Sequence, residues 1–163
     1  MNDPELLKEI ISNQDVLRVL KHMQLAKVDY AKNITKYTEI RMDVVNNCLK
    51  YLKEIDAVTI YRNTSVKRTA AKLKKSSEVH KHHTYYSITK TGTGLLNEIT
   101  PKLYLETMDI SALNIFFRKK IVPEDYVLRE ELIKFGIIDK KGKITPTGDE
   151  IFKEGLRIGV LKR

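Results

Sequence analysis

The sequence predicts an α+β fold that is mainly α-helical and carries small antiparallel β wings, and three observations lead to it. Apolar residues recur at three- and four-residue steps between residues 41 and 55, the period of a helix with one buried face. Two short stretches, Val58–Ile60 and Tyr86–Ile88, alternate in the manner of antiparallel strands. A block of the form I-T-x-T-G starts at both Ile88 and Ile144, which predicts a duplicated unit.

Composition limits the class of protein. The 163 residues are 42% apolar, which is enough to bury the core of one domain or of two small ones. No apolar run approaches the roughly 20 residues of a membrane helix, so we expect a soluble, cytoplasmic protein with no membrane partner. The formal net charge of +9 favours a polyanionic partner. A single cysteine, Cys48, rules out an internal disulfide and is expected to be a structural thiol rather than a nucleophile.

A helix predicted over residues 41–54 carries the candidate binding face. Arg and Asn side chains can form two hydrogen bonds at once with the major-groove edges of guanine and adenine. The alternative is a polar face that is simply solvated. The expected core-facing residues are Met42, Val45, Leu49, Leu52 and Ile55. The expected outward-facing residues are Arg41, Asp43, Asn46, Asn47, Lys50 and Lys53.

Shorter helices are expected before this one. The first covers residues 4–11 and packs either on its own domain or on a second copy of the chain. The next has a broad apolar face between Val16 and Met23, with His22 off that face and at the surface. Asp29 is expected to cap the helix that holds Ala31.

The segment between the two predicted strands is a long basic insert in which Glu78 is the only acid. Part of it is predicted to form a basic helix that contacts phosphates. The alternative is a disordered, solvated loop, and the two agree if the insert becomes ordered only on DNA. Its candidate DNA-binding residues are Arg62, Lys67, Arg68, Lys72, Lys74, Lys75 and Lys81.

A histidine cluster at the end of the insert raises a metal-binding alternative. His80, His82 and His83 can together bind a transition metal, but no Cys or carboxylate pattern closes a tetrahedral site around them. Contact with phosphate is the preferred interpretation, because the field around DNA favours charged imidazole. We therefore expect no metal and no other cofactor.

Two matched blocks in the same order predict two related domains, residues 1–100 and residues 101–163. Besides the I-T-x-T-G blocks, Leu52–Val58 matches Leu132–Ile138. Asp56 is expected to end its helix in the left-handed conformation, which Asp tolerates better than most residues.

The I-T-x-T-G blocks are expected to start helices. Thr89 and Thr145 would cap them, and Pro146 suits a first helical position because its missing N–H is not needed there. A phosphate-binding loop at Thr91–Gly94 is the competing interpretation. It is disfavoured because the loop lacks the spacing and the Lys of a nucleotide cradle.

These elements carry a family resemblance. The order helix, helix-turn-helix, strand, wing, strand and closing helix, with L-K-x-L-x-x-x-x-x-V at Leu49–Val58 and Y-x-I-T-x-T-G at Tyr86–Gly92, resembles winged-helix regulators of the MarR and ArsR type. The resemblance covers roughly residues 15–99 and, weakly, 109–155. It implies an archaeal tandem winged helix-turn-helix protein whose second unit is degenerate.

What the resemblance implies for function is a homodimer that binds double-stranded DNA in a sequence-specific manner through helix 41–54 and the wing 62–83. Two residues depart from the family pattern. Asp56 stands where Gly is usual at the helix end, and Asp43 places an acid near the expected DNA face.

The second unit is expected to have another role. Its predicted helix over Pro123–Phe135 presents acids, which repel phosphate, in place of Arg and Asn. The apolar stretch from Ile110 to Phe117 is expected to be core, with a dimer or partner surface as the alternative. The acids are Glu124, Asp125, Glu130 and Glu131.

Two functions from different classes remain. The first is a DNA-binding transcription regulator. The second is a winged-helix protein-interaction or assembly module without specific DNA binding. An enzyme is not expected, because no paired carboxylates, nucleophile with a base, or metal set occurs at a usable spacing.

Overall fold

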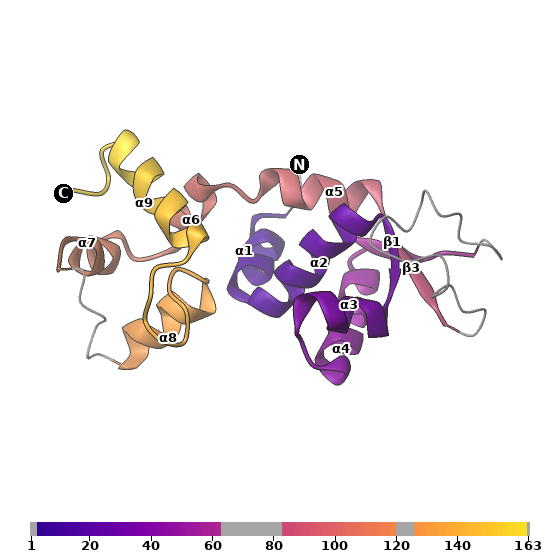
Figure 1. Ribbon diagram of the computed structural model, residues 1–163. Coiled ribbons are helices and arrows are strands. Elements are labelled where there is room, and N and C mark those ends of the chain that lie inside the picture. The colour runs from indigo at the N-terminus through magenta and orange to yellow at the C-terminus, as the bar shows by residue number, and fades with distance from the viewer. Residues whose placement is uncertain (1–2, 63–82, 120–125, 163) are drawn as a thin grey trace. The chain divides into compact units, whose positions relative to one another are not determined.

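The computed structural model describes residues 3–62, 83–119 and 126–162 (Figure 1). In these residues the protein is mainly helical with a three-stranded antiparallel sheet, which confirms the α+β class. The chain divides into two compact units, named here the central unit (residues 15–97) and the terminal unit (residues 3–14 and 98–163). Residues 3–14, which the expected boundaries assign to the first domain, therefore belong to the terminal unit.

In the central unit, the strands of the sheet lie between helices along the chain. Its elements are α2 (Gln14–Ala26), β1 (Val28–Tyr30), α3 (Ala31–Thr38), α4 (Met42–Glu54), β2 (Val58–Ile60), β3 (Tyr85–Ile88) and α5 (Lys90–Glu98). Strand β3 lies between β1 and β2 and is antiparallel to both. Val58 pairs with Ile88 and Ile60 with Tyr86, so the predicted pairing is confirmed. Strand β1 was not predicted.

The core of the central unit explains the orientation of α4. Val45, Leu49 and Leu52 are fully buried, as the apolar period predicts. Met42 is 39% exposed, so its assignment to the buried face is wrong. Met42 is the first residue of α4, and its sulfur accepts a hydrogen bond from Thr35 Oγ1 of α3 at 3.8 Å.

A buried polar network joins α2 to α3 and corrects two predictions. Asp29 lies in β1 and is 1% exposed, and it accepts hydrogen bonds from Tyr30 N at 2.9 Å and Asn33 Nδ2 at 2.7 Å. The N-cap of α3 is Tyr30, with no side-chain cap, so Asp29 does not cap the helix as predicted. His22 is also buried, with Nε2 2.8 Å from Asp29 Oδ2, and is not a surface residue.

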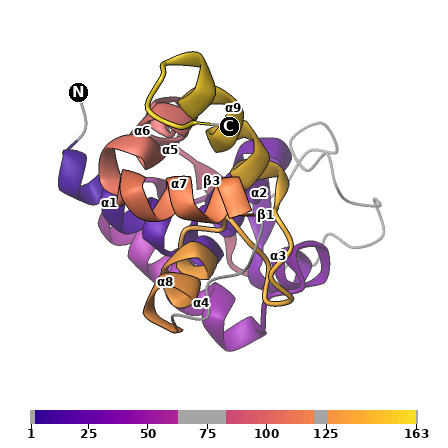
Figure 2. The same ribbon diagram turned by 90° about the vertical axis from the view of Figure 1, so that its left-hand side faces the viewer.

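The terminal unit contains α1 (Pro4–Ser12), α6 (Pro101–Thr107), α7 (Ile110–Lys119), α8 (Tyr126–Lys134) and α9 (Pro146–Arg157). Helices α6 and α9 lie side by side in both views (Figures 1 and 2). Leu113, Phe116 and Phe117 of α7 are buried, which confirms their prediction as core, while Ile115 is 54% exposed. No helix among the described residues is long and apolar enough to cross a membrane.

Both units contain the same hydrogen-bonded corner at the end of a helix. In the central unit, Ala57 N donates to Leu52 O at 2.8 Å, and Asp56 has a left-handed φ of 56° as expected. In the terminal unit, Ile137 N donates to Leu132 O at 2.8 Å, and Gly136 has a φ of 68°. The matched sequence blocks thus adopt one backbone geometry.

The corner continues into the next helix in both units. Thr89 Oγ1 accepts from Gly92 N at 3.0 Å and donates to Asp56 O at 2.6 Å. Thr145 Oγ1 accepts from Gly148 N at 3.1 Å and donates to the carbonyl oxygen of Gly136. The predicted caps are confirmed. Each threonine links the start of its helix to the backbone just after an earlier helix, α4 in the central unit and α8 in the terminal unit.

The connections that follow the two corners differ in length along the sequence. In the terminal unit an isolated antiparallel bridge joins Ile138 to Ile144, the counterpart of the Val58–Ile88 pair. Asp139 closes the short turn between them by accepting from Lys141 N at 2.8 Å and Lys143 N at 2.9 Å. The corresponding connection in the central unit runs through residues 63–82, which lie outside the described residues.

Candidate nucleic-acid interface

The outer face of α4 is polar and accessible. Asn46, Asn47 and Lys50 are exposed, because the helix turns Val45 and Leu49 fully into the core. Amide groups on the first two turns can form two hydrogen bonds at once with an adenine edge, and Lys50 adds a positive charge one turn further. The structure therefore brings these three predicted residues together on one face.

Arg41 is held by a neighbouring acid. It is the N-cap residue of α4, and its Nε and Nη2 donate to Asp43 Oδ1 and Oδ2 at 3.2 and 2.9 Å. The Arg41 and Asp43 side chains are 82% and 60% exposed. Such a solvated pair contributes at most about 1 kcal/mol. A better bidentate acceptor can therefore displace Asp43, and the guanidinium is not locked in place.

Of the basic insert, only its first and last residues are among those that the structure describes. Arg62 is exposed two residues after β2. The other predicted phosphate-binding residues, Lys67, Arg68, Lys72, Lys74, Lys75 and Lys81, lie outside the described residues, as do His80 and His82.

His83 is placed by an aromatic contact. Its ring stacks on Tyr30 with centroids 4.5 Å apart and planes 18° from parallel. Within residues 3–62, 83–119 and 126–162, no group of three His, Cys, Asp or Glu side chains could hold a metal ion. The stack connects the residue two positions before β3 to the N-cap residue of α3.

A hollow lies beside the exposed face of α4 and is named here the α3–α4 groove. Its volume is about 300 Å³. It is lined by Tyr30, Ala31 and Lys32 before and in α3, by Met42 and Asn46 of α4, and by His83, Thr84 and Tyr86 at and before β3. None of these side chains is acidic. Because the lining comes from four separate elements, β1, α3, α4 and β3, no sequence period indicates it.

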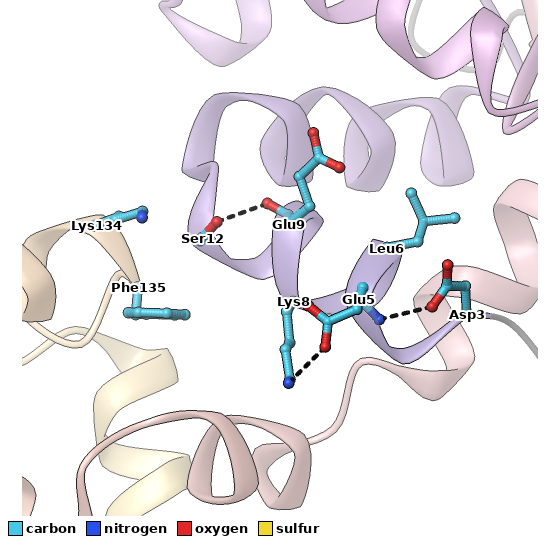
Figure 3. A pocket seen from close by; sticks show the side chains of 8 residues that line it. All are labelled: Asp3, Glu5, Leu6, Lys8, Glu9, Ser12, Lys134 and Phe135. Carbon is cyan, nitrogen blue, oxygen red and sulfur yellow. Dashed lines mark hydrogen bonds and ion pairs between the residues drawn. The ribbon is translucent and has the colours of Figure 1, made fainter.

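A second hollow, the α1 groove, lies in the terminal unit and has the opposite character (Figure 3). It is lined by Asp3, Glu5, Leu6, Lys8, Glu9 and Ser12 of the first helix and its cap, and by Lys134 and Phe135. Lys8 Nζ is already paired with Glu5 at 2.9 Å. Three carboxyl groups among its lining make this hollow unfavourable for a phosphate.

The charge of the chain is concentrated in one unit. Residues 15–97 contain 16 Lys and Arg against 7 Asp and Glu, whereas the rest of the chain contains 14 of each. The central unit therefore holds the whole net charge of +9, and the terminal unit is neutral. A polyanion is attracted to the unit that exposes the α4 face.

Cys48 is buried on the inner flank of α4. Loss of hydration raises the pKa of its thiol from 9.0 to about 11, and the negative charge of Asp15 acts in the same direction. A thiol with this pKa is almost entirely protonated near neutral pH and is a poor nucleophile. This agrees with a structural role.

These features define a class: a two-unit, mainly helical α+β protein whose central unit carries a basic and polar candidate binding face. Residues 7–99 match the model of the family "Uncharacterized protein conserved in archaea (DUF2250)", and the chain belongs to that family. The match includes the whole central unit and confirms the archaeal assignment. No curated protein and no solved structure matches the chain.

Proposed function

We propose that this protein binds double-stranded DNA in a sequence-specific manner and regulates transcription. In this proposal α4 enters the major groove, and the basic segment 62–83 contacts phosphates. The observation that carries it is the coincidence of exposed Asn46, Asn47 and Lys50 on one helix face with a unit that holds the entire net charge.

The architecture of the central unit supports the same proposal. The order α2, β1, α3, α4, β2, β3 with sheet order β1-β3-β2 is that expected of a winged helix-turn-helix, with α4 as the recognition helix. The repeated corner supports a second, degenerate winged-helix unit at residues 98–163. A homodimer would present two α4 helices to two half-sites.

Binding to a pool of random duplexes, followed by sequencing of the bound fraction, tests the function directly. A preferred site should emerge from the pool. Fluorescence anisotropy on that site should then show weaker binding by Asn46→Ala and Asn47→Ala, by roughly 5- to 150-fold for each lost bidentate contact worth about 1–3 kcal/mol.

Asn97 provides a matched control, because it is an exposed amide on the surface of α5 in the same unit. Asn97→Ala should leave the affinity within about twofold. Absence of any duplex binding at low salt, together with co-purification of a protein partner, would instead favour the protein-interaction module.

A further inference from the structure

The α3–α4 groove lies directly beside the proposed base-contacting face and has no assigned role. We propose that it holds one phosphodiester group of the DNA strand whose bases face Asn46. This inference rests on the proposed function and extends it, because it names a phosphate site formed by β1, α3, α4 and β3 together with His83, the last residue of segment 62–83, rather than by the lysines and arginines of the basic insert.

The chemistry of the lining fits an anion. Lys32 is exposed at the rim and supplies the positive charge. Thr84 and Tyr86 bring hydroxyl groups that can donate to phosphate oxygens, and His83 adds an imidazole N–H. No carboxyl group of the lining opposes these donors, in contrast to the α1 groove.

The position of the groove fits a DNA backbone. Asn46 belongs both to the groove and to the exposed face of α4, so the hollow lies within reach of a strand that meets the helix at this residue. The small side chain of Ala31, the first residue of α3, leaves room there. At about 300 Å³ the groove is at the lower end of the volumes usual for ligand pockets, which suits a group as small as one backbone unit.

The salt dependence of binding tests the assignment. Each neutralised phosphate contributes a slope of about −0.9 to the plot of log affinity against log salt concentration. Lys32→Gln should therefore make this negative slope shallower by about one and weaken binding to all duplexes alike. Lys21, exposed on α2 and absent from the groove, is the matched control, and Lys21→Gln should change the slope by less than half as much.

Two neutral variants separate the groove from general electrostatics. Ala31→Leu fills the hollow without changing any charge and should weaken binding at least fivefold. Tyr86→Phe removes one donor and should weaken binding by about 2- to 10-fold, in line with one lost hydrogen bond. Circular dichroism checks that each variant is folded. If Ala31→Leu does not fold, Lys32→Gln still tests the site, because it changes only an exposed side chain.

The outcomes distinguish the inference from the proposed function. If the wild-type protein binds a duplex and Lys32→Gln behaves like Lys21→Gln while Tyr86→Phe binds normally, the phosphate site is wrong and DNA binding stands. If the wild-type protein binds no duplex at any salt concentration, both are overturned. A selective slope change in Lys32→Gln supports both.

Discussion

Two glycines of α9 should respond to the same substitution by different amounts. A Cβ atom at Gly148 would lie well within 3.0 Å of the carbonyl oxygen of Ile137, a backbone atom fixed by the corner. A Cβ atom at Gly155 would also come within 3.0 Å of a neighbour, but that neighbour is Cδ1 of the Leu161 side chain. A backbone carbonyl cannot move without breaking the hydrogen bonds that it accepts, whereas a leucine side chain can rotate to another conformation.

The magnitudes follow from these contacts. Alanine stabilises a helix by up to about 1 kcal/mol relative to glycine. At position 148 this gain is outweighed by overpacking, about 1–3 kcal/mol, and by weakening of the 3.0 Å bond from Thr145 N to Ile137 O, about 1 kcal/mol. Gly148→Ala should thus lose about 1–3 kcal/mol. For Gly155→Ala, an off-rotamer Leu161 costs about 0.5–1.5 kcal/mol, so the net change should stay within about 1 kcal/mol.

Urea unfolding followed by circular dichroism at 222 nm measures the difference. The chain has no Trp, so the helical signal is the practical probe. Gly92→Ala, at the equivalent corner of the central unit, should resemble Gly148→Ala, because its Cβ would overlap the carbonyl oxygen of Ala57. Equal losses for Gly148→Ala and Gly155→Ala would refute the assignment of the cost to a fixed backbone atom.

Three further predictions concern the central unit. Asp43→Asn should release Arg41 and remove a negative charge from the α4 face, so affinity for random duplex DNA should rise severalfold in anisotropy titrations; unchanged or weaker binding would contradict this. Asp29→Asn should destabilise the fold by about 1–3 kcal/mol in urea, because an amide N–H₂ would face donors now bonded to a carboxylate; a neutral substitution would argue against the buried network. Cys48 should react with a disulfide reagent at pH 8 roughly 100-fold more slowly in the native state than in urea. Its rate should rise with pH up to its pKa of about 11, and equal rates in both states would show that the thiol is accessible.

Local rules predicted much of the fold. The caps at Thr89 and Thr145, the left-handed Asp56 and the pairing of Val58 with Ile88 depend on residues whose chemistry acts within a few positions or through a short alternating pattern. The polar face of α4 followed from the same helical period that buries Val45 and Leu49.

The errors arose where tertiary contacts decide. His22 and Asp29 are seven residues apart on different elements, and only the packing of α2 against β1 brings them to 2.8 Å and satisfies both. An acid before a helix is usually a cap, but here it bonds the side chain of Asn33 instead. The same limit applies to the α3–α4 groove, because Lys32 and Tyr86 come from elements more than fifty residues apart.

The repeated corner shows what the backbone does and does not determine. The two units share this scaffold, because their hydrogen bonds, left-handed residues and glycine contacts match. The matching segments are residues 52–92 and 132–148. Their net charges are nevertheless +9 and zero. A difference in binding between the units would therefore have to come from their side chains and from the segment that follows each corner, since the corner is common to both. This is the reason that substitutions on α4, and not on the corner, are the ones that would separate the proposed DNA recognition from folding.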